Sequence, residues 1–460
     1  MGSIIPLFKL LSHFEPAFED EEGVVTLGNI HGPISKSERT SFVTYASRVH
    51  SYDGLGEERI ALSSYIQALQ LTNRTCLLPN LRTLRVYGGP WEPEVYFFFS
   101  PSLRTVALRE TDSEYHPDSS SVLHSLQRVT ANLTSIDVSA SWSTVGLGAI
   151  SSIHFLKNLH LSHDHSTEGP KGPEGPFRLD VNFLLDLPCS ESLSTLSIAY
   201  FDLFADQSTR HQQATAFPVL KRLRLLLSLT SMGPLTKLLQ NAKMSSLQEV
   251  DISISPRRMD ESEIAHWKNL FRALPVTTSN LQHFVLSATS EPSGAFWSNL
   301  NLSIKDFEHL SQCNLATFTV YPPIFSTLSL GDISSLLSRG GDLNLLTLRT
   351  PGLGFEVLVI IAQTLPKLTF LSAGIDGRQL LAADSIPILE HRLGTLIVTG
   401  RLERPLTLAR LIDRIFPHLF YTLFSPSQDP DNEEWVQVES LLKVLREARS
   451  DERARSSRNV

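Results

Sequence analysis

A six-residue pattern, apolar-x-x-apolar-x-apolar, recurs twelve times between Leu81 and Val398. It reads LRTLRV at Leu81–Val86 and LRTVAL at Leu103–Leu108, and it continues in this form to LGTLIV at Leu393–Val398. The first leucines of neighbouring copies lie 22 to 37 residues apart. A short hydrophobic cassette that returns at such steps is typical of stacked repeats, in which each repeat buries its apolar side chains against its neighbours.

The spacing inside the cassette predicts a β-strand, because successive strand residues point to opposite faces. We therefore expect the fourth and sixth residues to face the core and the third and fifth to face away from it. Between cassettes the apolar residues take helical spacing, as in Val122, Leu123, Leu126 and Val129. A strand followed by a helix, repeated, predicts parallel strands joined by right-handed crossovers.

Two architectures fit this alternation, a closed eight-stranded barrel and an open solenoid. Twelve cassettes exceed the eight strands of the barrel, so the sequence favours an α/β open horseshoe with a parallel sheet. We place the solenoid of about twelve repeats at residues 76–430.

The two ends of the chain lack the cassette and predict helical caps. Residues 1–75 contain a capping box at Ser35 and Glu38, followed by two apolar helical stripes. Residues 431–460 begin with an apolar stripe, which predicts a capping helix. The stripe consists of Trp435, Val438, Leu441, Leu442 and Leu445. The charged, Ser- and Arg-rich end of this segment is expected to be disordered.

Composition narrows the partners and the compartment. The 460 residues carry a formal net charge of −8, which gives no reason to expect nucleic acid or a membrane as a partner. The three cysteines have neither zinc-ligand nor disulfide-framework spacing, which fits a reducing compartment, so we expect the cytoplasm, the nucleus or both. We also expect no signal peptide, and no stretch approaches the roughly 18 apolar residues of a membrane span.

Candidate chemistry is sparse, and we expect no enzyme, no catalytic residue and no cofactor. His160, His163 and His165 lie close together in the sequence and are candidate metal ligands, the alternative being ordinary surface histidines. Cys189 would be a nucleophile only if a distant histidine met it in space. The glycine pairs lack a full phosphate-loop fingerprint, and we read them as turns.

The concave face of the expected horseshoe is the better candidate site, because it offers a protein partner a long polar surface. Arg and Tyr, both frequent there, are enriched at binding hot spots. The alternative is that these residues are solvated or pair laterally across strands, as Arg222 and Arg224 could with Glu249 and Asp251. The candidates are Arg85, Tyr87, Arg109, Asp137, His160, Arg222, Arg224, Asp251, His283, Tyr321 and Arg349.

The cassette resembles the leucine-rich repeat of ribonuclease-inhibitor-like proteins. The Asn or Cys usual eight positions after the first leucine is absent, with Gly89, Thr111 and Ser141 in those places. This departure and the irregular steps resemble the divergent repeats of F-box leucine-rich-repeat proteins. The segments IIPLFKLLSHF (Ile4–Phe14), FVTYASRVHSYD (Phe42–Asp53) and EEWVQVESLLKVLREAR (Glu433–Arg449) are similar to parts of the basidiomycete family of such proteins.

The resemblance implies a substrate-recognition role in a cullin ubiquitin ligase, with the repeats holding a protein substrate. The F-box, which in that family docks on the Skp adaptor, is not in these 460 residues, and residues 1–75 look like the segment that follows it. Skp and cullin are therefore expected partners only if an F-box lies upstream. Two alternatives remain open, a free-standing repeat scaffold unrelated to ubiquitin and a metalloprotein using the histidine cluster.

Overall fold

The computed structural model describes most of the chain, and the account below concerns those residues alone. They are residues 3–19, 25–54, 60–72, 76–87, 93–109, 119–140, 144–163, 178–187, 189–205, 217–228, 231–255, 261–278, 280–288, 306–307, 310, 312–321, 330–337, 341–378, 380, 386–400, 402–424 and 433–458. The chain divides into two compact units, Met1–Arg222 (unit 1) and Leu223–Val460 (unit 2).

Strands and helices alternate along both units. The strands are β1 Phe14–Glu15, β2 Phe18–Glu19, β3 Val25–Thr26, β4 Asn29–Ile30, β5 Ser51–Gly54, β6 Thr83–Tyr87, β7 Thr105–Arg109, β8 Ser135–Ala140, β9 Asn158–His163, β10 Arg178–Asp180, β11 Thr195–Phe204, β12 Arg222–Ser228, β13 Glu249–Ser255, β14 His283–Ala288, β15 Thr317–Val320, β16 Leu345–Leu353, β17 Phe370–Ile375, β18 Thr395–Thr399 and β19 Tyr421–Phe424. The helices are α1 Ile5–Phe8, α2 Lys36–Ala46, α3 Leu62–Thr72, the 3₁₀ helix η1 Pro93–Phe98, α4 Ser119–Val129, α5 Thr144–Ile150, α6 Val181–Leu185, α7 Met232–Asn241, α8 Glu261–Thr277, α10 Leu330–Leu337, α11 Glu356–Thr364, α12 Pro405–Ile415 and α13 Glu433–Arg458.

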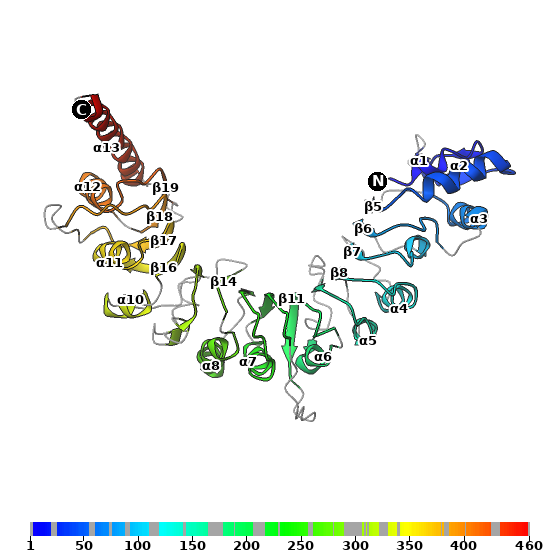
Figure 1. The fold of residues 1–460 in the computed structure, drawn as a ribbon, viewed down its shortest axis with the longest axis horizontal. Helices are drawn as coiled ribbons and strands as arrows, with labels where there is room; N and C mark the ends of the chain where they lie inside the picture. Colours follow the sequence, from blue (N-terminus) through cyan, green and yellow to red (C-terminus); the bar gives the residue numbers. More distant parts are fainter. Residues whose placement is uncertain are drawn as a thin grey trace. The chain divides into compact units, whose positions relative to one another are not determined.

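Every one of the twelve cassettes forms a strand, and each strand begins two residues after the first leucine. The first leucines are at most 8% exposed, and the fourth residues, such as Leu84 and Leu396, are buried as well. Within each unit the helices that connect successive strands, such as α4 in unit 1 and α8 in unit 2, lie along one side of the sheet (Figure 1). Each unit is thus two layers with its apolar core between strands and helices.

A backbone hydrogen-bond motif recurs between repeats and explains their regular stacking. The carbonyl of the second cassette residue accepts from two N–H groups of the next repeat. Arg82 O accepts from Arg104 N and Thr105 N at 2.9 and 3.0 Å, and Thr369 O accepts from Gly394 N and Thr395 N at 3.0 Å each. Neighbouring strands therefore start in register.

The strands follow the order of the sequence, and all their described pairings within this sheet are parallel. Unit 1 has the order β5-β6-β7-β8-β9-β11, with β10 beside β11, and in unit 2 the order runs from β12 to β19. β5 and β19 end the strand order, so the sheet is open and is not a barrel. This confirms the predicted open leucine-rich-repeat fold.

Three strands of this sheet, β5, β10 and β19, lie outside the twelve cassettes and escaped the sequence prediction. Two of them, β5 and β19, form the ends of the strand order. In β5 the fourth cassette position is Tyr52, which is buried, but the sixth is Gly54. In β19 the fourth position is Thr422, which is 6% exposed. Each of these two strands follows the cassette in degraded form, with one apolar position replaced.

The N-terminal segment packs two helices, α2 and α3, and the capping box at the start of α2 is formed as predicted. Ser35 Oγ accepts from Glu38 N at 3.3 Å, and Glu38 Oε2 accepts from Ser35 N at 2.7 Å. Glu38 Oε1 also accepts from Ser12 N at 2.6 Å, which ties the residues after α1 to α2. These hydrogen bonds lower the pKa of Glu38 to about 2, and the bond from Ser12 makes the largest contribution.

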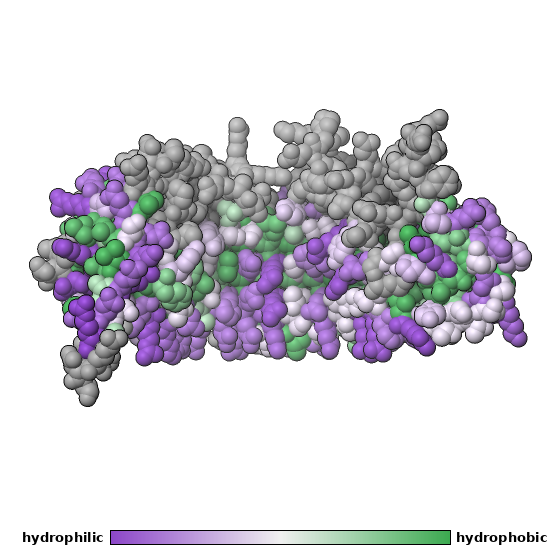
Figure 2. Space-filling model, turned by 90° about the horizontal axis from the view of Figure 1, so that it is seen from above, coloured by the Kyte–Doolittle hydropathy of each residue, from purple (hydrophilic) through white to green (hydrophobic). Residues whose placement is uncertain are grey.

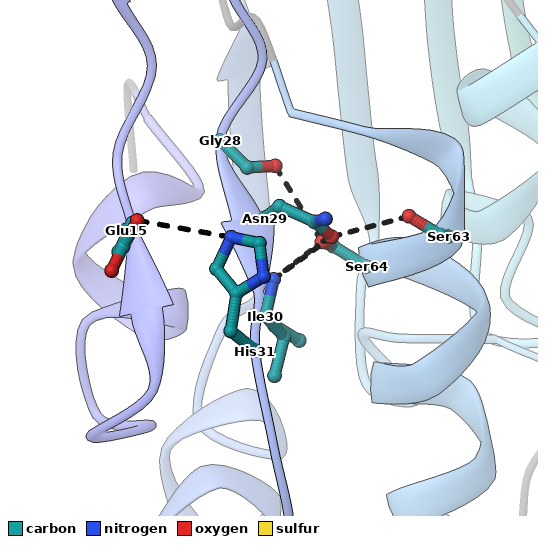
Figure 3. Close-up of polar contacts among 7 residues, drawn as sticks. All are labelled: Glu15, Gly28, Asn29, Ile30, His31, Ser63 and Ser64. Atoms are coloured by element: carbon teal, nitrogen blue, oxygen red, sulfur yellow. Dashed lines mark hydrogen bonds and ion pairs between the residues drawn. The ribbon is translucent and has the colours of Figure 1, made fainter.

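A buried serine fastens the small antiparallel pair β1–β4 to α3 (Figure 3). Ser64 Oγ accepts from Ile30 N at 3.1 Å and donates to Asn29 Oδ1 at 2.9 Å, while Ser63 Oγ donates to the same oxygen at 3.2 Å. Ser64 is 0% exposed, so its two bonds satisfy a hydroxyl that water does not reach.

At the end of unit 2, α13 packs on α12 and β19. Of the predicted apolar stripe, Trp435, Val438 and Leu442 are buried, and Leu441 and Leu445 are half-buried. Phe420 is the second residue of the cassette that forms β19. Its carbonyl accepts from Arg446 Nη1 at 3.1 Å. Arg446 thus supplies a donor where a following repeat would supply two N–H groups.

The prediction of a disordered tail is wrong for the described residues, because α13 continues to Arg458. No Gly or Pro interrupts this segment, and Asp451 and Arg455 stand at the i, i+4 spacing that supports a helix. In the part of the chain that the structure describes, no helix is both long and apolar enough to cross a membrane.

Candidate binding surface

The side of each sheet away from its helices, here called the helix-free face, carries the third, fifth and seventh cassette residues. These positions are mostly polar, and parallel register aligns equivalent positions of neighbouring repeats. Asp137 of β8 stands opposite His160 of β9, which stands opposite Ser197 of β11. Seen from one side, the surface of the molecule mixes hydrophilic and hydrophobic residues (Figure 2).

In unit 1 four of these side chains form a connected row, here called the lateral network. Arg109 Nη2 lies 2.7 Å from Asp137 Oδ2. His160 Nε2 lies 3.7 Å from Asp137 Oδ1, and His160 Nδ1 lies 2.6 Å from Ser197 Oγ. The row crosses β7, β8, β9 and β11 without a break.

Ser197, His160 and Asp137 are neighbours along this row, and these three residue types form the catalytic triad of many hydrolases. The geometry here differs from that of a catalytic triad. The 3.7 Å from His160 to Asp137 exceeds hydrogen-bond range, whereas a triad carboxylate holds its imidazole by a hydrogen bond. The three strands also pair in a parallel ladder, which engages the backbone N–H groups that an oxyanion hole would need. The arrangement favours lateral pairing over catalysis.

Arg109 is held on two sides and still half exposed. Its guanidinium carbon lies 5.7 Å from the centre of the Tyr87 ring, and its side chain is 50% exposed. The hydrogen bond to Asp137 raises the pKa of Arg109 above its usual value, so the guanidinium remains charged. Such an exposed ion pair contributes at most about 1 kcal/mol to stability, and its larger effect is to fix where the guanidinium points.

The neighbouring pair Asp53 and Arg85 lies at the start of the same face. Asp53 Oδ2 and Arg85 Nη1 are 3.5 Å apart, and both side chains are more than two-fifths exposed. A contact of this length and exposure holds Arg85 less firmly than Asp137 holds Arg109.

Unit 2 carries a separate charged group on β12 and β13. Arg224 Nε and Nη2 both donate to Glu249 Oε1, at 3.1 and 2.7 Å. Burial raises the pKa of Asp251, Glu249 adds to the rise, and Arg224 opposes it. The lateral pairing that the sequence offered as an alternative therefore exists for Arg224, with Glu249 as its partner.

The remaining predicted residues are spread over the helix-free face. His283 Nδ1 lies 3.0 Å from Thr317 Oγ1, and Tyr321, just after β15, is 45% exposed. Arg222 is exposed at the start of β12. Arg349 belongs to β16, but its side chain lies outside the described part of the molecule.

The histidine cluster is not gathered into one site by the described residues. His160 and His163 lie three residues apart on β9, an odd step that puts their side chains on opposite faces of the strand. His163 packs near the Phe201 ring, with 6.1 Å between ring centres. His165 lies outside the described residues, within which no group of three His, Cys, Asp or Glu is placed to hold a metal.

Three members of these contacts escaped the sequence analysis, Asp53, Ser197 and Thr317. Asp53 and Ser197 occupy the fifth position of their cassettes, the position of Asp137 and His160, and Thr317 occupies the third. Ser197 is chemically inconspicuous alone, and Asp53 belongs to the degraded cassette of β5. Aligning all repeats by position would have found them.

Comparison with known proteins gives a loose structural likeness alone. No protein-family profile matches the sequence, and no curated protein matches it. The chain is similar to a crystal structure of a TLR13–ssRNA13 complex, with TM-score 0.36, 14% identity, and coverage of 76% of this chain and 46% of that one. It is also similar to a yeast Rad7 and Elc1 complex structure, with TM-score 0.35, 14% identity, and coverage of 77% of this chain and 82% of that one.

Proposed function

We propose that this chain is a non-enzymatic repeat module that binds a protein partner through its helix-free face. The observation that carries the proposal is Arg109, fixed by Asp137 and Tyr87 and yet half exposed. Arg and Tyr side chains that are ordered before binding lose little entropy when a partner arrives, which is why such residues dominate binding energy.

A substitution at Arg109 tests the binding surface. Proximity labelling in cells would identify and quantify the proteins near the wild type, Arg109→Ala and Arg128→Ala. Arg128 is exposed on α4, on the helix side, and serves as the matched control. We expect the main partner to be lost at least about tenfold with Arg109→Ala, as for a hot spot, and retained with the control. Equal recovery with both variants would refute the proposal.

The more specific role we propose is substrate recognition for a cullin ubiquitin ligase. Its support is the resemblance of the cassettes and of both flanking segments to F-box leucine-rich-repeat proteins. The role requires an F-box outside these 460 residues, and the Skp adaptor and cullin would be bound through that module. The cytoplasm or nucleus is the proposed location. Cullin ligases act in these compartments, whose reducing conditions keep cysteines free.

Purification of the full product of the natural gene distinguishes this role from a free-standing scaffold. Recovery of Skp and cullin, lost when the region upstream of Met1 is deleted, would support the ligase role. Recovery of other proteins without either component would instead support the scaffold alternative.

A further inference from the structure

A row of basic side chains follows one edge of the sheet in unit 1. It consists of the second cassette residues Arg82, Arg104, Lys157 and Lys221, here called the basic edge. Backbone hydrogen bonds fix their order, since Arg104 N donates to Arg82 O at 2.9 Å and Lys221 N donates to Ser194 O at 2.8 Å. The two intervening second positions are Thr134 and Ser194, whose N–H groups continue the same ladder.

The four side chains are exposed, and none forms an ion pair with the acidic residues that the structure describes. The cations of the helix-free face differ in this respect, since Arg85 and Arg109 each have an aspartate partner. The basic edge is also confined to the first unit. The equivalent positions of unit 2 hold uncharged residues, namely Gln248, Gln282, Ala316, Asn344, Thr369, Gly394 and Phe420.

The geometry of the row sets the size of the anion it could hold. Five hydrogen-bonded steps separate Arg82 from Lys221. At about 4.8 Å between neighbouring strands, the row spans about 24 Å, the length of about seven residues of extended peptide. Four cations without an ion-pair partner among the described residues create a positive local potential along that length, in a chain whose net charge is −8.

We infer that the basic edge binds a short acidic segment of a partner protein in extended conformation. The positive charge of the basic edge is complementary to an anion, and the negative net charge of the whole chain favours a short anion over a long one. A long polyanion such as nucleic acid would also face the chain's overall negative charge, whereas a segment of about seven residues can lie within the positive row. The inference concerns a surface other than the lateral network and does not rest on the proposed ligase role.

Fluorescence anisotropy with a labelled deca-glutamate peptide tests the inference. The edge variant replaces Arg82, Arg104, Lys157 and Lys221 with Gln. The control variant replaces Lys237, Lys243, Arg272 and Arg410, four exposed cations on or beside helices of unit 2, with Gln. Both variants change the net charge from −8 by −4 to −12, so general electrostatics is matched. All eight residues are exposed, and circular dichroism would verify that both variants fold.

We expect the wild type and the control to bind the peptide at low salt and to lose affinity as salt rises. The loss of four exposed charge pairs predicts at least about fourfold weaker binding by the edge variant. Failure of the wild type to bind, or equal weakening in both variants, would overturn the inference. Tighter binding of a ten-nucleotide thymidine oligomer than of the peptide would overturn it in favour of nucleic acid.

Discussion

His391 is expected to make unit 2 sensitive to mild acid. This histidine precedes β18 and is 5% exposed. Its Nε2 donates to Leu365 O at 2.7 Å, and its Nδ1 accepts from Leu393 N at 3.0 Å. Both bonds together require the neutral imidazole, because a protonated Nδ1 would face an N–H donor. Burial lowers the pKa of His391 below 6.5, and the bond to Leu365 opposes that shift.

The sign of the pH effect follows from which state takes up the proton first. As the pH falls through 6.5, His391 binds a proton in the unfolded chain but not in the folded one, so the free energy of unfolding decreases. Full stability is present above this pH, and the loss ends at the lower folded pKa. At pH 5.5, one unit below 6.5, a histidine that stays neutral in the folded protein lowers the free energy of unfolding by about 1.4 kcal/mol. This value is the upper limit for His391 at that pH.

The assay is urea unfolding near pH 7.5 and near pH 5.5, followed by tryptophan fluorescence. Trp267 and Trp435 are buried in unit 2 and report on its unfolding. His391→Asn offers an oxygen to Leu393 N but leaves Leu365 O without its donor, so we expect a loss of about 1–3 kcal/mol at the higher pH. His418→Asn, at an exposed position, is the control and should leave both values unchanged.

The decisive quantity is the difference between wild type and His391→Asn in their loss of stability on acidification. The other titrating groups are common to both proteins and cancel in this difference. If both lose the same free energy between the two pH values, His391 is not the group responsible and the reasoning fails.

Three further predictions follow from buried or capped groups. Ser64→Ala should lower the free energy of unfolding by about 1–3 kcal/mol in thermal unfolding, since it removes the bonds that hold β4, with exposed Ser63→Ala costing less. Arg446→Ala should speed hydrogen exchange in β19 by uncovering the Phe420 carbonyl, and unchanged exchange would contradict the capping role. Burial raises the pKa of Cys189 to about 11, so a thiol reagent near pH 8 should modify Cys189 in urea and spare it in the native protein.

The repeat cassette was readable from the sequence because its signal is local. Burial of the first, fourth and sixth residues follows from strand alternation and from the turn that precedes each strand. The burial of Leu84 or Leu396 can therefore be predicted without knowing which distant residues it contacts. β5 and β19 were missed for the same reason. Gly54 and Thr422 interrupt the local pattern, and these segments are stabilised by contacts distant in sequence, including their pairing with β6 and β18.

The candidate site was readable as a face and not as a set of contacts. Sequence alternation placed Arg109, Asp137 and His160 on the helix-free face. It could not show that Arg109 pairs with Asp137, or that His160 contacts Ser197, because these partners lie 28 and 37 residues apart. Loops of unequal length separate them, and the register of the parallel ladder decides which side chains meet.

By itself the sequence therefore determined the positions of the twelve cassette strands, their buried residues and the open repeat architecture, since each depends on short-range periodicity of apolar residues. The tertiary structure decided which polar groups are satisfied and which remain available. It paired Arg109 with Asp137 and left the basic edge without described partners, because such pairings depend on distances between repeats that no local pattern encodes.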